Sequence, residues 1–142
     1  MATSIKWYRQ AFKSAFQGDI NFEEDDIKVV LVDDTYTIDQ DGDVAYSDIS
    51  SYEVSGDGYT AGGNVLGTPT VTTPASKTVM LDGEDTVWPS SEVTARGAVI
   101  YNNTPASKPL ICFVDFGEDI ISIGGDFRII WNATGIVDVV VE

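Results

Sequence analysis

The chain has 142 residues, of which 43% are hydrophobic, and its 23 acidic and 8 basic residues give a formal net charge of −15. This length supports one domain with its own core, residues 1–142, and is too short for two ordinary domains. The acidic balance argues against a nucleic-acid partner, and the absence of histidine removes the commonest general base and transition-metal ligand, which nearly excludes zinc chemistry.

The strongest helical pattern lies at the start of the chain, in TSIKWYRQAFKSAFQGD. We expect an amphipathic helix over residues 1–18, capped by Ser4 and ended by Gly18 in a left-handed conformation. No window of the chain approaches the roughly 20 apolar residues of a membrane helix, so we expect a soluble protein with no membrane partner. The apolar face of the predicted helix consists of residues at three- and four-residue spacing: Ile5, Tyr8, Phe12, Ala15 and Phe16.

One flank of this predicted helix is basic. Lys6, Arg9 and Lys13 are three of the eight basic residues of the chain, so a basic, aromatic helix precedes an acidic body. Two interpretations stay open at this point. The helix either covers the edge of a sheet with its cations in solvent, or it also contacts a partner.

The body, residues 19–142, is expected to be rich in β-strands. Ile27–Val32 predicts a buried strand between acidic flanks, and Ser47 is placed to cap one further short helix that ends near Val54. Short β-branched and aromatic runs then alternate with turn residues at the spacing of antiparallel strands, which predicts a mainly β fold, an antiparallel β-sandwich or jelly roll. The runs are TPTVTTP, KTVMLDG, DTVWPS, TARGAVIYNN, PLICFVDFGED, FRIIWNATG and IVDVVVE.

Two of these runs are apolar at nearly consecutive positions, Ala98 to Tyr101 and Phe127 to Trp131. Strands with such a pattern are covered on both faces. The second cover would come from the N-terminal helix, a second sheet or another copy of the chain. Cys112 is predicted to be a small buried hydrophobic residue, because a reactive thiolate would need a histidine partner, and a single cysteine forms no intramolecular disulfide.

An acidic turn at IDQDGDVAYSD imitates the start of a calcium-binding loop. Asp39, Asp41 and Asp43 alternate as hard oxygen ligands would. However, Gly42 stands at the fourth position of the loop instead of the sixth, and no glutamate stands at the twelfth. We interpret the stretch as an acidic surface turn, with a cation site of another geometry left open.

The glycine-rich stretch YEVSGDGYTAGGNVL, residues 52–66, fails the tests for a phosphate-binding loop. A dinucleotide fingerprint would need a glycine where Ala61 stands, and a P-loop would need a lysine after Gly63. We therefore expect no cofactor and interpret its glycines as a hinge between the short helix and the first strand that follows. The Gly62-Gly63 pair would permit a bulge or a close backbone crossing. Tyr59 is expected to pack against the core or a neighbouring subunit, with its hydroxyl near water.

No catalytic constellation stands out, so we expect that the protein is not an enzyme. A Ser/His/Asp arrangement needs the histidine that the chain lacks. The paired carboxylates of EEDD, VDDTY and GED would permit a glycosidase-like pair by count. Acidic residues crowd every turn, however, and a solvated, mutually repelling surface explains them better.

Five segments follow one another along the chain: DDIKVVLVDDTYTID, SDISSYEVSGDGYTAGGNVL, VWPSSEVTARGAVIYNN, PLICFVDFGED and FRIIWNATGIVDV. In this order they resemble a group of small virion structural proteins of tailed bacteriophages. Members begin with a short helix, followed by a KVALV strand, an EVxGxGYTAGG turn, a WSSTITARGAVIY segment and a closing IxWNAxGI. The resemblance extends from Ile27 to Val139 and rests on the joint order of the motifs. This chain departs from the group in being unusually acidic between Asp19 and Asp57.

The resemblance implies a place in a virion, assembled in the host cytoplasm. The favoured expectation is a non-enzymatic capsid decoration, or cement, protein that stabilises the head and binds the major capsid protein as a trimer. A high negative charge on its outward side would keep crowded particles apart. The proposed partner contacts are Lys6, Trp7, Arg9 and Lys13 of the predicted helix, together with Tyr59.

The alternative is a tail-associated module or fibre tip that contacts the host surface. It would bind a glycan through exposed aromatic side chains such as Tyr46, Tyr52 and Tyr59. A glycan-cleaving tail enzyme is the third and least favoured hypothesis, because it would need a carboxyl group with a raised pKa inside a cleft.

Overall fold

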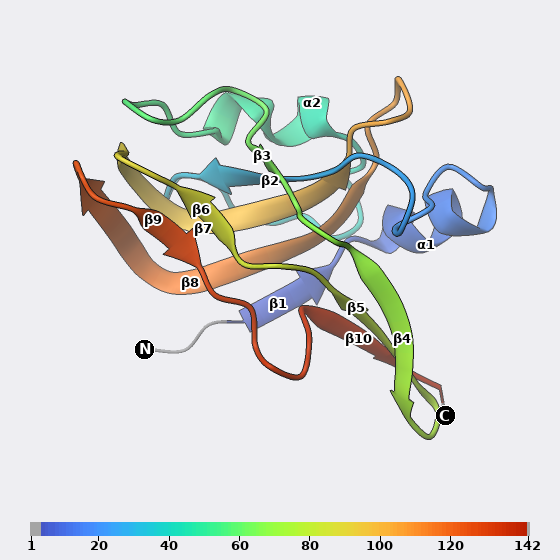
Figure 1. Cartoon of the computed structure of the whole chain (residues 1–142). Helices are drawn as coiled ribbons and strands as arrows, with labels where there is room; N and C mark the ends of the chain where they lie inside the picture. Colours follow the sequence, from blue (N-terminus) through green and yellow to red (C-terminus); the bar gives the residue numbers. More distant parts are fainter. Residues whose placement is uncertain (1–3, 142) are drawn as a thin grey trace.

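The computed structural model describes residues 4–141 (Figure 1). The strands are β1 (Ser4–Trp7), β2 (Ile27–Val32), β3 (Asn64–Val65), β4 (Thr70–Ala75), β5 (Thr78–Asp82), β6 (Thr86–Trp88), β7 (Glu92–Asn102), β8 (Leu110–Ile123), β9 (Phe127–Ile129) and β10 (Val137–Val140). The helices are α1 (Arg9–Phe16), α2 (Tyr46–Ile49) and the 3₁₀ helix η1 (Ser50–Tyr52). Strands predominate, which confirms the predicted mainly β class.

The strands of the described residues form three antiparallel sheets. The main sheet has five strands in the order β1-β8-β7-β2-β3, and the two small sheets are β10-β5-β4 and β6-β9. Figure 1 shows the small sheets on one side of the main sheet and α2 on the other. The predicted sandwich-like class is thereby confirmed, whereas the jelly-roll alternative is not.

Strand β7 is buried on both faces from Ala98 to Tyr101, as predicted. The same prediction for Phe127 to Trp131 was wrong, because Arg128 and Ile130 are exposed. Along β2, Val29 and Leu31 point into one hydrophobic core, while Val30 and Val32 point into a second core on the opposite face. Trp88 and other residues of the small sheets cover the first core, so a second sheet is indeed one of the covers. The second core has a cover that the sequence analysis did not anticipate.

That cover is the segment 33–63, which runs across the main sheet and includes α2 and η1. The Val54 amide donates to the Leu31 carbonyl at 3.0 Å, and the Asp33 amide donates to the Tyr52 carbonyl at 2.9 Å. Tyr36 and Ile49 are buried in the second core. The segment is therefore held to the edge of β2 by main-chain hydrogen bonds and to its face by apolar packing.

The predicted N-terminal helix is half wrong, because residues 4–7 form strand β1. Ser4 to Trp7 pair with Asp115 to Cys112 of β8, so Ser4 does not cap a helix. The helix begins only at Arg9, after Tyr8, and its end at Gly18 is as predicted, with φ +84°. Pairing with β8 gives hydrogen-bond partners to backbone groups that the first turn of a helix would leave without partners. This favours a strand over the helix that the periodicity predicted.

The second helix is confirmed, but not its cap. Ser47 lies inside α2, and helical structure continues through η1 to Tyr52, close to the expected end. Asp48 instead satisfies the helix start, because its carboxylate accepts from the Val44 and Ala45 amides at 2.9 and 3.0 Å. A carboxylate within the first turn also interacts favourably with the helix dipole.

The glycine-rich stretch joins η1 to β3 as a hinge, in agreement with the prediction. Gly63 has φ +77°, and a Cβ atom at this position would lie 1.9 Å from the Val29 carbonyl oxygen. The expected close backbone crossing is therefore the point where the chain returns to pair β3 with β2.

Candidate interaction surface around the N-terminal helix

The chain changes from strand β1 to helix α1 at one fully buried tyrosine. Tyr8 has extended φ and ψ of −85° and 134°, and its amide donates to the Ile111 carbonyl at 3.1 Å. Its hydroxyl lies 2.8 Å from that of Tyr36 in the second core. The buried, hydrogen-bonded side chain of Tyr8 fixes the chain where β1 ends, so α1 leaves the sheet in a defined direction.

Lys6 and Trp7, two of the predicted contact residues, point to opposite faces of the main sheet. They are neighbours on a strand, so their side chains alternate; Lys6 lies opposite Phe113 of the second core and is exposed, whereas Trp7 packs against the first core. The Trp7 indole donates to the Asp138 carbonyl at 3.0 Å, and its ring lies 4.8 Å from that of Phe12. The two residues therefore do not form one contact surface.

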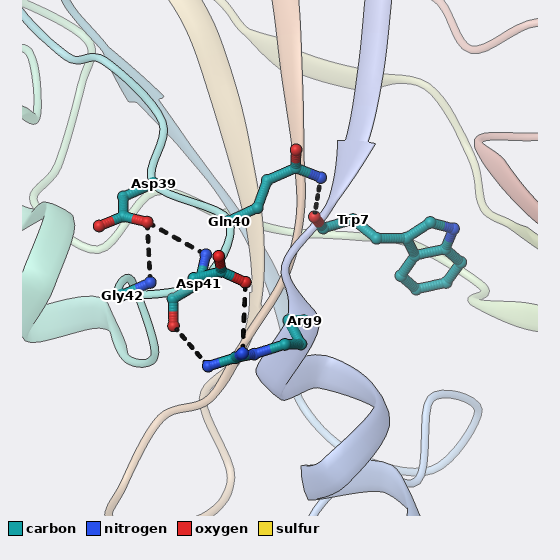
Figure 2. A network of polar contacts seen from close by, with 6 residues as sticks. All are labelled: Trp7, Arg9, Asp39, Gln40, Asp41 and Gly42. Atoms are coloured by element: carbon teal, nitrogen blue, oxygen red, sulfur yellow. Dashed lines mark hydrogen bonds and ion pairs between the residues drawn. The ribbon is translucent and has the colours of Figure 1, made fainter.

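Arg9 is engaged with the acidic turn of its own chain. Figure 2 shows its guanidinium against Asp41, whose carboxylate lies at 3.4 Å and whose carbonyl accepts at 3.3 Å. The Arg9 amide donates to the Gln40 carbonyl at 3.0 Å, and the Gln40 side chain donates to the Trp7 carbonyl at 2.7 Å. An exposed ion pair of this kind stabilises by only about 0.2–1 kcal/mol, so its main effect is to place the turn beside α1.

The carboxylates of Asp39 and Asp43 in the acidic turn accept hydrogen bonds from groups of their own segment. Asp39 accepts from the Asp41 and Gly42 amides at 3.1 and 2.9 Å (Figure 2), and Asp43 accepts from the Asp39 amide and the Tyr36 hydroxyl. Within residues 4–141 no group of three or more metal-ligating side chains is arranged to hold an ion. Asp39, Asp41 and Gly42 are exposed, so the stretch is a surface turn around Asp-Gly.

Tyr59 lies away from α1 and is held by its own chain. Its ring packs 6.0 Å from that of Trp88, and its hydroxyl donates to Glu53 and accepts from the Leu31 amide at 3.1 Å. Packing against the core is confirmed, and the hydroxyl is held by part-buried hydrogen bonds within the chain. Burial, followed by the hydrogen bond to Glu53, raises the pKa of Tyr59 far above its ordinary value.

Glu53 accepts several hydrogen bonds at once, a role that the sequence did not reveal. Its carboxylate accepts from the Tyr46 hydroxyl at 2.5 Å, from the Gly62 amide at 2.8 Å and from the Tyr59 hydroxyl. Tyr46 also stacks on Tyr101 with ring centroids 4.9 Å apart. One carboxylate therefore joins α2 to the glycine hinge, a link that only tertiary folding brings together.

Helix α1 leaves most of its apolar side chains exposed. Only Ala11 is buried, whereas Phe12 is 36% and Phe16 89% exposed. Beside the helix lies a groove of about 510 Å³ that it shares with the small sheet β10-β5-β4. Its apolar lining includes Trp7, Phe12, Phe22, Val71, Leu81 and Val139. Because the exposed ring of Phe12 lies in this apolar lining, the groove is the candidate interaction surface.

A second hollow of about 570 Å³ lies between β8, β9 and the loop that leads to β10. Its lining is largely apolar, and its charged members are Arg128 and Asp138. A third, of about 460 Å³, includes Asp33, Glu53 and Glu92, but the Glu53 carboxylate is turned to the tyrosines and Gly62. A carboxylate already bound by three donors is poorly placed to transfer protons to a substrate.

Cys112 is buried in the first core, as predicted, and burial raises the pKa of its thiol to about 12. None of the helices within residues 4–141 is long and apolar enough to cross a bilayer. No family model, curated protein or solved structure matches the chain.

Proposed function

We propose that this chain is a non-enzymatic structural protein of a tailed-phage virion, and specifically a capsid decoration protein that stabilises the head. The proposal rests on the resemblance of Ile27 to Val139 to small virion proteins, and on the exposed apolar surface at α1. In this proposal the groove beside α1 binds the major capsid protein, and copies of the chain assemble as trimers.

The observation that carries the attachment surface is the exposure of Phe16 on the helix whose Phe12 and Ala15 line the apolar groove. A solvent-exposed phenylalanine on a short helix contributes nothing to the core of its own chain. Covering it with a partner would remove apolar surface from water and stabilise the complex. Lys13, in the last turn of α1, is exposed on the same helix and adds a positive charge to an otherwise acidic protein.

The proposed contact set differs from the one that the sequence suggested. Trp7 and Lys13 remain, and two phenylalanines of α1 join them: Phe12, which lines the groove, and the exposed Phe16 at the end of the same helix. Arg9 is paired with Asp41, and Tyr59 is bound to Glu53. The remaining acidic surface would face outward, where like charges keep particles apart.

The alternative of a host-binding tail module receives less support. It relied on Tyr46, Tyr52 and Tyr59 as an exposed aromatic platform. All three are half-buried: Tyr46 stacks on Tyr101, the ring of Tyr52 lies 5.2 Å from that of Tyr36, and Tyr59 packs against Trp88. Rings that pack on their own core offer little face to a sugar.

The test is the copy number of this chain in purified particles, measured by quantitative mass spectrometry against the major capsid protein. A decoration protein approaches the number of capsid subunits, whereas a tail-tip protein is present in a handful of copies. A handful of copies would contradict the proposal and favour the tail module.

A further inference from the structure

The connection between β7 and β8 brings a lysine, an asparagine and an aspartate into a hydrogen-bonded chain. The Lys108 ammonium nitrogen lies 2.6 Å from the side-chain oxygen of Asn103. The side-chain nitrogen of the same amide donates to the Asp26 carboxylate at 2.9 Å. The amide of Asn103 is thus held between an amine on its oxygen side and a carboxylate on its nitrogen side.

Backbone contacts hold all three residues in place. The Asn103 backbone amide donates to the Asp26 carbonyl at 2.8 Å. The Lys108 backbone amide donates to the Pro105 carbonyl, and the Lys108 carbonyl accepts from the Tyr46 amide, each at 3.0 Å. Lys108 has φ +45°, a conformation that costs energy for a residue with a Cβ. All three side chains are half-buried, and Lys108 makes no ion pair with a carboxylate of the described residues.

The distance suits a reaction between the lysine nitrogen and the amide carbon. A C=O bond is about 1.23 Å long, so the 2.6 Å contact keeps Nζ within about 3.8 Å of Cγ. Reactive near-attack geometries need about 3–3.5 Å. A small rotation at the end of the lysine side chain therefore suffices, because oxygen and Cγ are bonded neighbours.

We propose that Lys108 and Asn103 become joined by an intramolecular amide bond between their side chains. The neutral amine of Lys108 attacks Cγ of Asn103 with its lone pair, and a new C–N bond forms. The bond between Cγ and Nδ2 breaks, and its electron pair leaves with the nitrogen. A proton lost by the lysine nitrogen ends on the departing group, which is released as ammonia, and Asp26 holds that group and assists the proton transfer. No oxidant or cofactor is required.

The cross-link would close residues 103–108 into a ring at the end of the longest hairpin. It would fix the left-handed Lys108 covalently and tie the start of β8 to the end of β7. The inference concerns the chain alone and does not depend on the proposed function.

The test is the intact mass of the full-length chain, freshly purified and after incubation between pH 7 and pH 9. Cross-linking lowers the mass by about 17 Da, the mass of ammonia. Conversion is expected to be faster at the higher pH, because only the neutral amine attacks. In tandem mass spectra, backbone cleavages between residues 103 and 108 should release no separate fragments. A chain that keeps its full mass throughout would overturn the proposal.

Variants separate this reaction from other losses of ammonia. Lys108→Arg retains the charge and the donor but should keep its full mass, whereas Lys77→Arg, at the other lysine with positive φ, should lose ammonia as the unmodified chain does. Asp26→Asn should slow conversion about tenfold or more. A mass loss that persists in Lys108→Arg would mark an asparagine that cyclised onto its own backbone. An unchanged rate of conversion in Asp26→Asn would exclude the role of Asp26. Either result contradicts the mechanism.

Discussion

Segment 33–63 and helix α1 both carry aromatic residues beside the main sheet, but they leave them in opposite states. In segment 33–63, Tyr36 and Tyr59 donate to carboxylates of their own segment, and Ile49 is buried. In the N-terminal segment, Phe12 and Phe16 of α1 have exposed rings. The first segment is satisfied internally and belongs to the fold, whereas the helix carries exposed apolar surface that a partner would cover in the proposed assembly.

The largest expected effect comes from the hinge that returns segment 33–63 to the sheet. Gly63→Ala would place a Cβ atom 1.9 Å from the Val29 carbonyl oxygen at a φ of +77°, so we expect the free energy of unfolding to fall by about 3 kcal/mol or more. Urea denaturation followed by circular dichroism measures it. Gly124→Ala is the matched control, since its φ is +80° with no atom within 4 Å, and an equal loss in both variants would refute the close crossing.

The next effect concerns the carboxylate that joins α2 to the hinge. Glu53→Ala leaves two tyrosine hydroxyls and the Gly62 amide without their acceptor, so we expect a loss of about 2–3 kcal/mol in the same denaturation experiment. The exposed Glu24 provides the control, and Glu24→Ala should change stability by no more than about 0.5 kcal/mol. Similar values for the two variants would show that segment 33–63 is not held through Glu53.

Alkaline pH should lower the free energy of unfolding through the buried tyrosines. Burial is the first cause that raises the pKa values of Tyr8, Tyr36, Tyr46 and Tyr59 above their ordinary value, and it raises the pKa of Tyr101 to about 12. Because the unfolded chain releases these protons at about pH 10, the stabilisation is complete below that pH. It is lost as the pH rises above 10 toward the higher folded pKa values.

Urea denaturation at pH 8 and at pH 10.5 tests this, with the phenolate absorbance near 295 nm as a second measurement. We expect a lower free energy of unfolding at pH 10.5, and an absorbance rise that is delayed in the folded chain relative to the chain in urea. Coincident absorbance curves would mean that the tyrosines are not protected.

The smallest effect on stability should come from α1. Phe16→Asp is expected to change the free energy of unfolding by no more than about 0.5 kcal/mol, because the ring is already exposed. Attachment to particles that lack the protein should nevertheless be lost, as measured by co-sedimentation. Ile123→Asp, at a position 80% exposed at the end of β8 and not on α1, should attach normally; loss of attachment in both variants would indicate a non-specific charge effect.

Much of the β-rich body could be predicted from the sequence. The buried strand Ile27–Val32 has the predicted bounds, and the later strands lie within or close to the predicted runs, because turn residues separate them. Strand β1 was missed because Ile5 and Tyr8 fit a helical spacing, and only pairing with the distant β8 reveals the strand.

The candidate site was harder to predict than the fold. The charges of Lys6, Arg9 and Lys13 suggested one basic flank, but the strand turns Lys6 away from Trp7, and Asp41 pairs with Arg9. Phe16 was assigned to the apolar face of the helix, but periodicity reports which residues share a face and not whether that face meets the core. The hydrogen bonds to Glu53 depend on contacts made only in the folded chain.

In the proposed function, the apolar groove beside α1 attaches the chain to a capsid. A reconstruction of the intact particle, with the density of this chain located, tests it most directly. We expect density on the head, with α1 and Phe16 against the shell and the acidic surface outward. Density at the tail tip, or on the head with α1 exposed to solvent, would contradict it.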